Sequence, residues 1–378
     1  MDRPIAVAAG HICLDVTPVF PPEAAGRAGT WLQPGSLTQV GRAELHTGGA
    51  VANTGLAMRR FGVEVRLLGK VGRDPFGALV RRMLEEDGGA QGLVEDPESD
   101  TSYSVVLSPP GMDRIFLHNP GANATFGPDD IAPETLEGAC WFHFGYPPLM
   151  ERLYRNAGQG LEAVLRKARE AGLAVSLDLA AVDPTSEAGK EDWRTILGRV
   201  LPLVDVFVPS WEELCFMIDR PRYEEVLRRA GGGEATAVLS LSRDVEPLAE
   251  EAVKLGAKNL LLKCGAAGFY YRTGGADALS GMAEALGRDM TPWVNLRGFQ
   301  RSYRPARVLS GTGAGDSTIA AFLAALLRGW PPEDCLRLAA ATGASCVEAY
   351  DALGGLLPLE EQEKRIRAGL ETQDLLRP

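Results

Sequence analysis

The sequence predicts an α/β protein with a central, mostly parallel β-sheet, helices on both faces of that sheet, and a small β-sheet acting as a lid. Short apolar runs alternate with longer segments of helical period, as expected where crossover helices link parallel strands. Two segments interrupt this alternation and have the pattern of a second sheet. A glycine-rich turn directly precedes a long apolar helix near the C-terminus.

The candidate strands of the main sheet are short, and several are continuous apolar runs of the kind buried on both faces. The helix expected at 161–172 shows the alternation, because Leu161, Val164, Leu165 and Ala168 recur at helical spacing and Gly172 provides the stop. The strands are expected at 5–9, 65–69, 141–144, 174–177, 206–208 and 260–263.

The lid is predicted from two insertions into a single domain that spans 1–378. Residues 17–47 are rich in Pro and Gly without helical period, and residues 101–118 alternate weakly around the turn Pro109-Pro110-Gly111. A sheet inserted there would lie over the carboxyl ends of the parallel strands, where open α/β sheets bind ligands. A third irregular stretch, 273–307, could be a second flap, an oligomer contact or a mobile excursion.

Composition excludes several classes of protein. The 378 residues hold 39 Lys and Arg against 50 Asp and Glu, and the net charge of -11 has the wrong sign for gripping nucleic acid or an anionic membrane. The six cysteines form no CxxC pair and are expected to be buried free thiols, and the four histidines form no metal motif. No export signal or membrane span is apparent, so we expect a cytoplasmic protein.

The most informative segment is the turn before the C-terminal helix. Gly313, Ala314 and Gly315 have almost no side chain, so the backbone amides at the helix start can approach an anion directly, and the helix dipole favours negative charge there. Asp316 follows in the first turn, either as a helix cap or as a base beside a bound phosphate. From Ile319 onward the apolar residues predict a helix with one buried face.

Two common nucleotide motifs do not match this turn. Gly311, Gly313 and Gly315 nearly satisfy the dinucleotide fingerprint, but the third spacing is wrong and no βαβ unit precedes them. A Walker A loop needs Gly-Lys-Ser/Thr, which is absent. A dinucleotide-dependent oxidoreductase is therefore disfavoured.

A second glycine motif, His46-Thr-Gly-Gly-Ala-Val-Ala-Asn53, opens a helix expected to end at Gly62. Asn53 falls among small and apolar residues, where an amide is costly unless it has a partner. It either bonds to local backbone or points at ligand hydroxyls. Asp15, just past the first strand, is placed to accept hydrogen bonds or to serve in a turn.

Taken in order, these motifs resemble those of the ribokinase-like (PfkB) carbohydrate kinases, and the resemblance covers most of the chain. The matching segments are GHICLD at 10–15, GGAVAN at 48–53, KVGRDPFG at 70–77, PGAN at 120–123, PSWEE at 209–213, KCGAAG at 263–268 and GTGAGD at 311–316.

The resemblance implies transfer of the ATP γ-phosphoryl group to a sugar hydroxyl. It assigns Asp316 as the base, with Gly313, Ala314 and Gly315 as the anion hole. A carboxylate suffices as the base, because the loose transition state releases the alcohol proton late. The other implied positions are Asp15, Gly48, Gly49, Asn53 and Asn123 for the sugar, Ser210, Lys263, Gly265, Gly268 and Thr312 for the nucleotide, and Glu213 for Mg²⁺.

Three departures from the family pattern leave alternatives open. Ser310-Gly311 stands where the family usually has Asp-Thr, so a monovalent-cation site is left open, and Ser210 replaces the usual Asn. Ala50 replaces a lysine found in true ribokinases, so ribose is not implied as the substrate. The alternatives are a non-catalytic sugar- or nucleotide-binding protein and a nucleoside kinase. The exposed edge of a lid favours a homodimer.

The assignment of Asp316 carries one structural requirement. Its carboxylate must face an open site and must not be buried in bonds to its own chain.

Overall fold

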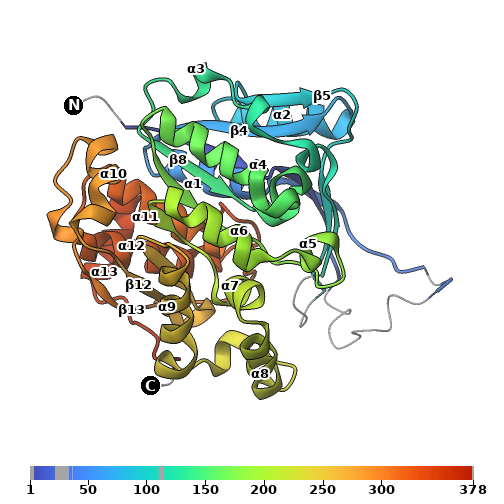
Figure 1. Cartoon of the computed structure of the whole chain (residues 1–378). Coiled ribbons are helices and arrows are strands. Elements are labelled where there is room, and N and C mark those ends of the chain that lie inside the picture. Colours follow the sequence, from blue (N-terminus) through green and yellow to red (C-terminus); the bar gives the residue numbers. More distant parts are fainter. Residues whose placement is uncertain (1–3, 22–33, 36, 110–114, 377–378) are drawn as a thin grey trace.

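The computed structural model describes residues 4–21, 34–35, 37–109 and 115–376. Its main feature is a nine-stranded sheet in the order β13-β12-β11-β10-β9-β8-β1-β4-β5 (Figure 1). The strands from β5 to β11 are parallel, whereas β12 and β13 are antiparallel. The bounds are β1 Ile5–Gly10, β4 Glu64–Gly72, β5 Leu93–Asp96, β8 Trp141–Gly145, β9 Ala174–Leu177, β10 Val206–Phe207, β11 Leu260–Lys263, β12 Gly268–Arg272 and β13 Arg297–Arg301.

Helices cover both faces of this sheet, which confirms the predicted fold class. Alternate residues of β1 point to opposite sides. Ala6 and Ala8 join one apolar cluster with α1, α2 and α10 to α13, while Val7 and Ala9 join another with α3, α4 and α6 to α9. The bounds are α1 Ala50–Arg60, α2 Pro75–Glu86, α3 Pro133–Leu136, α4 Glu151–Glu170, α5 Glu187–Lys190, α6 Trp193–Val200, α7 Trp211–Ile218, α8 Arg220–Ala230, α9 Glu246–Lys254, α10 Ala276–Leu286, α11 Ala314–Leu327, α12 Pro332–Cys346 and α13 Leu359–Arg367.

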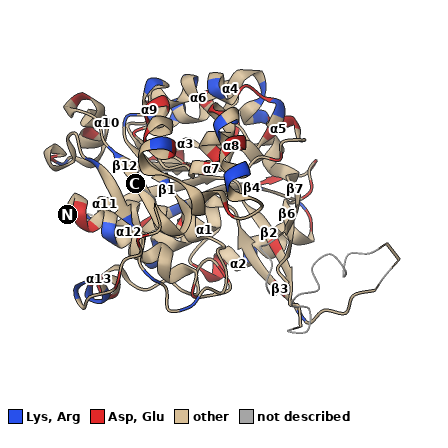
Figure 2. Ribbon diagram, turned by 90° about the horizontal axis from the view of Figure 1, so that it is seen from below, with Lys and Arg blue, Asp and Glu red and all other residues tan. Residues whose placement is uncertain are grey.

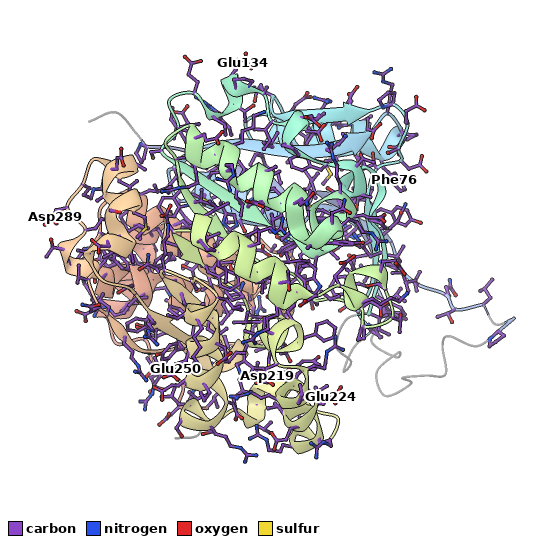
Figure 3. The ribbon with its side chains drawn as sticks, viewed as in Figure 1. Phe76, Glu134, Asp219, Glu224, Glu250 and Asp289 are labelled. Carbon is purple, nitrogen blue, oxygen red and sulfur yellow. The ribbon has the colours of Figure 1, made fainter. Side chains whose placement is uncertain are left out.

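A separate four-stranded sheet, ordered β3-β2-β6-β7, lies at one side of the molecule (Figure 2). It consists of β2 Cys13–Pro18, β3 Ala43–Gly48, β6 Tyr103–Leu107 and β7 Ile115–Asn119. Strands β3, β6 and β7 lie in or at the ends of the two predicted insertions, whereas most of β2 precedes the first one. Residues 22–33, 36 and 110–114, with the expected turn at Pro110-Gly111, lie outside the described residues. Phe76 of α2, labelled in Figure 3, packs edge-on against Tyr103 at 5.6 Å between ring centroids.

The stretch 273–307 corrects the sequence-based expectation of an irregular excursion. It forms α10 and then β13, which pairs with β12 as the edge of the main sheet. Trp293, between these elements, packs edge-on against Phe322 of α11 at 5.7 Å. Backbone pairing was not visible in the sequence because β13, Arg-Gly-Phe-Gln-Arg, lacks an apolar run.

The predicted helices form, but with differences in their ends and their burial. α1 ends at Arg60 with Phe61 as its C-cap, close to the expected stop. α11 is buried on nearly every side, not on one face as predicted, because it is enclosed by α1, α12 and the sheet. The helix expected at 161–172 is the second part of α4, whose backbone is non-helical from Arg155 to Gly158.

Other sequence predictions concern cysteine and charge. All six cysteines are free, and all but the partly buried Cys140 are buried. Among the described residues, basic and acidic side chains are intermixed on the outer helices (Figure 2). In the same part of the chain, no helix combines the length and hydropathy needed to cross a membrane.

Candidate active site

The candidate site lies where the carboxyl ends of the parallel strands meet the N-terminus of α11. In open α/β sheets this edge is the usual ligand site, because every strand–helix connection on it presents loop side chains. Tyr146 directly follows β8, Asp178 follows β9, and Lys263 ends β11. Asn53 and Thr54 reach the same place from the first turn of α1.

Asp316 is the centre of a group that we call the acceptor cluster, made of Asn53, Thr54, Tyr146 and Asp316. Asn53 Nδ2 donates to one carboxylate oxygen at 3.3 Å, and Thr54 Oγ1 donates to the other at 3.1 Å. The Tyr146 hydroxyl lies 2.8 Å from both oxygens. The Asn53 amide, which would be costly without a hydrogen-bond partner, is therefore bonded to Asp316, the predicted base.

The surroundings of Asp316 do not meet the structural requirement in this structure, because the carboxylate is buried and bonded to its own chain. Its side chain lies beside the glycine turn, as expected, but the residue is only 5% exposed and its oxygens already accept bonds from three side chains. Two of these donors, Asn53 and Tyr146, are partly exposed, whereas Thr54 is fully buried. The carboxylate is therefore enclosed by donors from its own chain.

The glycine turn has the geometry of an anion site. Gly313 is the N-cap of α11 and has a left-handed backbone with φ 71°, which favours glycine. Within the described residues, no side chain bonds to the first amides of α11 as a cap. A methyl group on Gly313 would lie 2.3 Å from Ala352 Cβ, so the position also has no room for a side chain.

A second group, which we call the lysine cluster, contains Asp178, Glu213 and Lys263. Lys263 Nζ donates to Asp178 Oδ1 at 2.8 Å, and a methyl group on Gly315 would lie 3.5 Å from the same Nζ. The ammonium therefore lies beside the glycine turn. Its position suits a negatively charged ligand at the start of α11.

Charge and burial shift the protonation of this cluster. Burial, against the attraction of Lys263 and together with the negative charges of Glu213 and Asp316, raises the pKa of Asp178 to about 8. Burial lowers the pKa of Lys263, but the attraction of Asp178, Glu213 and Asp316 outweighs it, so the net shift is upward. One ammonium thus serves three neighbouring carboxylates.

Glu213 has a structural role that the sequence did not reveal. Its carboxylate accepts from Ser210 N at 2.8 Å, and Ser210 Oγ accepts from Glu213 N at 3.2 Å, which is a capping box at the start of α7. The described residues contain no group of three His, Cys, Asp or Glu side chains able to hold a metal by themselves. Mg²⁺ usually binds proteins through one or two carboxylates and keeps several waters, so Asp178 and Glu213 suit an ion that arrives on a nucleotide.

The predicted sugar positions near the first strand lie together. Asp15 pairs with His46 across β2 and β3, and Cys13 Sγ donates to Asp15 Oδ1 at 3.4 Å. A methyl group on Gly48 would lie 2.3 Å from Asp15 Oδ2, so glycine lets the carboxylate lie against the main chain. Gly49, with φ 86°, is the N-cap of α1.

Asn123 does not fit its predicted role as a sugar contact. It is fully buried, its Oδ1 accepts from Ile12 N at 3.1 Å, and its Nδ2 donates to Ile12 O at 2.8 Å and to Pro120 O at 3.2 Å. The amide is used to fix the connection between β1 and β2. Because a buried amide satisfies its own groups with these bonds, Asn123 has a structural role here, and its contact with a sugar stays a prediction.

The structure also describes the remaining nucleotide positions. Gly265, with φ 58°, lies in the turn between β11 and β12, and a methyl group on Gly268 would lie 2.1 Å from Gln300 O of β13. Thr312 N donates to Ser310 Oγ at 3.1 Å, just before α11. Their contacts with a nucleotide stay a prediction.

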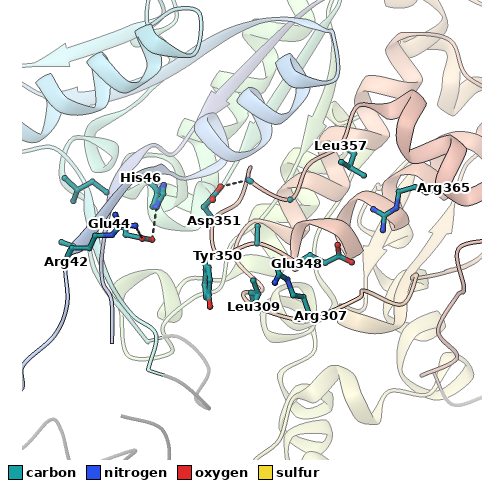
Figure 4. Close-up of a pocket in the computed structure, with 15 residues that line it drawn as sticks. Arg42, Glu44, His46, Arg307, Leu309, Glu348, Tyr350, Asp351, Leu357 and Arg365 are labelled. Atoms are coloured by element: carbon teal, nitrogen blue, oxygen red, sulfur yellow. Dashed lines mark hydrogen bonds and ion pairs between the residues drawn. The ribbon is translucent and has the colours of Figure 1, made fainter. Parts of the chain in front are cut away.

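A cavity of about 920 Å³ opens between the small sheet and the C-terminal part of the chain (Figure 4). Residues 42–46 of the small sheet form one wall, and Arg307 with residues 348–351 forms another. Ala352, next in the chain, is the residue packed against Gly313. Neither Asp316 nor any residue of the turn Gly313 to Gly315 lines this cavity.

Three residues of the two clusters were missed by the sequence analysis. Thr54 stands next to Asn53 as a second polar residue in an apolar turn, and Asp178 directly follows an apolar strand, as Asp15 does. Tyr146 follows β8 and precedes two prolines. Each position is a polar residue at the carboxyl end of a strand or at the start of a helix, a signal that could have drawn attention to them.

Comparison with known proteins identifies the family. Residues 24–356 match the pfkB family carbohydrate kinase, so the chain belongs to this family, as the motifs indicated. It is a sugar kinase, a phosphotransferase with a hydroxyl group as acceptor.

Two relatives are similar to this chain in sequence over most of its length. An uncharacterized sugar kinase of Archaeoglobus fulgidus is 24% identical over 303 residues, covering 80% of this chain and 98% of that protein. The probable fructokinase-5 of Arabidopsis thaliana is 25% identical over 334 residues, covering 85% and 88%.

Solved structures share the fold. The ribokinase of Arabidopsis thaliana, solved with ribose and ATP, has a TM-score of 0.67 at 21% identity, covering 96% of this chain and 98% of that one. The fructokinase of Xylella fastidiosa, solved with ATP, has a TM-score of 0.68 at 20% identity and the same coverage.

Proposed function

We propose that this sugar kinase transfers the γ-phosphoryl group of ATP to a hydroxyl of a small carbohydrate, with Asp316 as the base and the amides of Gly313, Ala314 and Gly315 as the anion hole. The observation that carries the proposal is the joint position of Asp316, the uncapped start of α11 and Lys263 at one edge of the sheet. Each supplies a different requirement of phosphoryl transfer.

The geometry suggests how the step proceeds. The acceptor hydroxyl would bond to Asp316, and its oxygen would attack the γ-phosphorus as the bond to the ADP oxygen breaks. The alcohol proton would pass late to the carboxylate. Because the transition state is loose, stabilising charge on the transferred group matters more than basicity, and the helix amides with Lys263 would provide that stabilisation.

Mg²⁺ is proposed as the ion that accompanies ATP. When bound, it neutralises charge on the phosphate oxygens and orients them. Asp178 and Glu213 would hold it, through water where direct contact is lacking. A cation beside Asp178 would favour its ionised form, whose pKa burial and the charges of Glu213 and Asp316 raise to about 8.

The small sheet is proposed as a lid. Asp15 and His46 lie on its strands β2 and β3, and residues 42–46 form a wall of the cavity between this sheet and the C-terminal part of the chain. Closure of this sheet over the bound sugar would exclude water from the reacting groups. In this proposal the sugar enters through the cavity, and the closed lid covers it.

The test is ADP release by the full chain with Mg·ATP and a panel of pentoses, ketohexoses, deoxy-keto acids and nucleosides. We expect release that depends on one class of sugar and that Asp316→Asn abolishes. Binding of sugar and ATP without ADP release from any compound would favour the non-catalytic alternative. Release with nucleosides alone would favour the nucleoside kinase.

Self-association through the lid is proposed as well. Leu45 on β3, Phe116 and Leu117 on β7 are 41%, 50% and 56% exposed, and both strands are edges of the small sheet. Light scattering of the full chain should give the mass of a dimer, and Phe116→Glu should shift it toward the monomer. A monomer at all concentrations would contradict this.

A further inference from the structure

The bonding of Asp316 leaves no free position for an acceptor. A carboxylate has about four lone-pair positions. Asn53 and Thr54 use one each, and the Tyr146 hydroxyl bridges both oxygens at 2.8 Å. A sugar hydroxyl that bonds to Asp316 must therefore replace one of these three donors.

The three donors are not equally fixed. Asn53 and Thr54 are neighbours on α1, where the helix holds their backbone, and Thr54 is fully buried. Asn53 is partly exposed and makes the longest bond to Asp316, 3.3 Å, but its backbone amide is bonded to Gly49 O at the helix start. Tyr146 lies outside any helix, between the end of β8 and Pro147, and it is partly exposed. Its single proton is shared between two acceptors, so the bond to each oxygen is weaker than a linear one. Tyr146 is thus the donor that can be displaced.

The backbone conformation of Tyr146 also supports its displacement. Its φ of 66° and ψ of 41° place a bulky residue in the left-handed region, which costs about 1–3 kcal/mol and persists where the surroundings impose it. The residue before a proline is also restricted in this region of conformations. A strained residue directly over the base is positioned to change conformation when a ligand arrives.

We propose, on the basis of the proposed function, that the Tyr146 hydroxyl holds the acceptor's place on Asp316 until a sugar displaces it, and that it thereby keeps water from using the base. Without Tyr146, a water molecule would take that place and attack the γ-phosphorus. The bond from the γ-phosphorus to ADP would break, the water proton would pass to Asp316, and phosphate would leave. The tyrosine is a specificity-determining residue that favours alcohol over water as the acceptor.

The test is phosphate release from Mg·ATP without sugar, comparing the wild type with Tyr146→Phe, which keeps the ring and removes the hydroxyl. We expect sugar-independent hydrolysis to rise about tenfold, the worth of one hydrogen bond to a charged group. The rate of sugar phosphorylation should change by less than about threefold, since the hydroxyl is absent from the reacting complex. Tyr154→Phe is the matched control, because Tyr154 packs against Trp193 of α6.

Two outcomes would overturn this inference while leaving the proposed function intact. One is unchanged hydrolysis in Tyr146→Phe with normal sugar phosphorylation. The other is a large loss of phosphorylation without added hydrolysis, which would make Tyr146 a permanent support of the base. The added hydrolysis must also disappear in the double variant Tyr146→Phe/Asp316→Asn.

A measurement on the wild type covers the case in which Tyr146→Phe does not fold. The sugar found in the ADP-release screen is replaced by its analogue lacking the acceptor hydroxyl. This analogue has no hydroxyl to take the place of the Tyr146 hydroxyl, so it should inhibit phosphorylation competitively while ATP hydrolysis stays at its level without sugar. Stimulated hydrolysis would overturn the inference, because water would then use the base with Tyr146 still in place, whereas a wild type that releases no ADP with any sugar would remove the proposed function itself.

Discussion

The acceptor cluster and the lysine cluster flank the same helix start but are stabilised in different ways. In the acceptor cluster, one carboxylate is surrounded by neutral donors from α1 and from the end of β8. In the lysine cluster, one ammonium balances several carboxylates. Neutral donors fix position, whereas opposite charges neutralise each other.

This difference teaches what each cluster can tolerate. Loss of a neutral donor leaves the charge of Asp316 unchanged and alters only its orientation. Loss of the ammonium leaves buried carboxylates without compensation, so the whole site is affected. The variants below are ordered from the largest expected effect to the smallest.

Asp316→Asn removes the only titratable group of the acceptor cluster able to take the alcohol proton. We expect kcat to fall by about 10²–10⁴-fold with little change in sugar or ATP affinity, as typical for loss of a general base. Steady-state kinetics and ligand titration measure the two effects. Asp289→Asn, at an exposed turn (Figure 3), is the control. A wild-type rate in Asp316→Asn would refute its role as the base.

Lys263→Met should affect both stability and nucleotide binding. We expect the free energy of unfolding to fall by about 3 kcal/mol, because a buried charge pair loses one partner, and ATP to bind about tenfold or more weakly. Urea unfolding and ATP titration measure these effects. Lys254→Met, whose pair with Glu251 is exposed, should be near wild type. If Asp178→Asn in the same chain does not restore stability, charge balance is not what the lysine provides.

The lysine cluster should also make stability depend on pH. The pKa of Asp178 is about 8 in the folded chain, above its unfolded value, so its stabilising contribution is complete below about pH 4 and is lost as pH rises through 8. We expect the free energy of unfolding to fall by about 3 kcal/mol between pH 5 and 7, because each pH unit in this window contributes about 1.4 kcal/mol. The fall should be smaller in Asp178→Asn. Equal slopes in urea unfolding would argue against this interpretation.

The smallest effect is expected for a neutral donor of the acceptor cluster. Thr54→Val removes the bond to Asp316 while keeping the side-chain shape, and kcat should fall by about three- to tenfold, the worth of one hydrogen bond. Thr54→Ser should recover most of the loss because it restores the hydroxyl. A loss as large as that of Asp316→Asn would show that the neutral donors do more than orient the base.

Much of this architecture could be predicted from the sequence. Apolar runs predicted the parallel strands β1, β4, β8, β9, β10 and β11 but not β5, which has only two apolar residues. The turn at Gly313 predicted the start of α11, because it too is a local pattern. The edge strand β13 and the all-round burial of α11 could not be predicted, because they depend on which neighbours cover them.

The chain's own sequence determined where its strands, helices and two glycine motifs lie, because backbone preferences and apolar spacing act over a few residues. Only the tertiary structure decided which side chains meet. Asn53 and Asp316 are 263 residues apart, and Tyr146 and Asp316 are 170 apart. Such pairs form because the order of strands in the sheet brings their carboxyl ends together, and no local pattern in the sequence records that order.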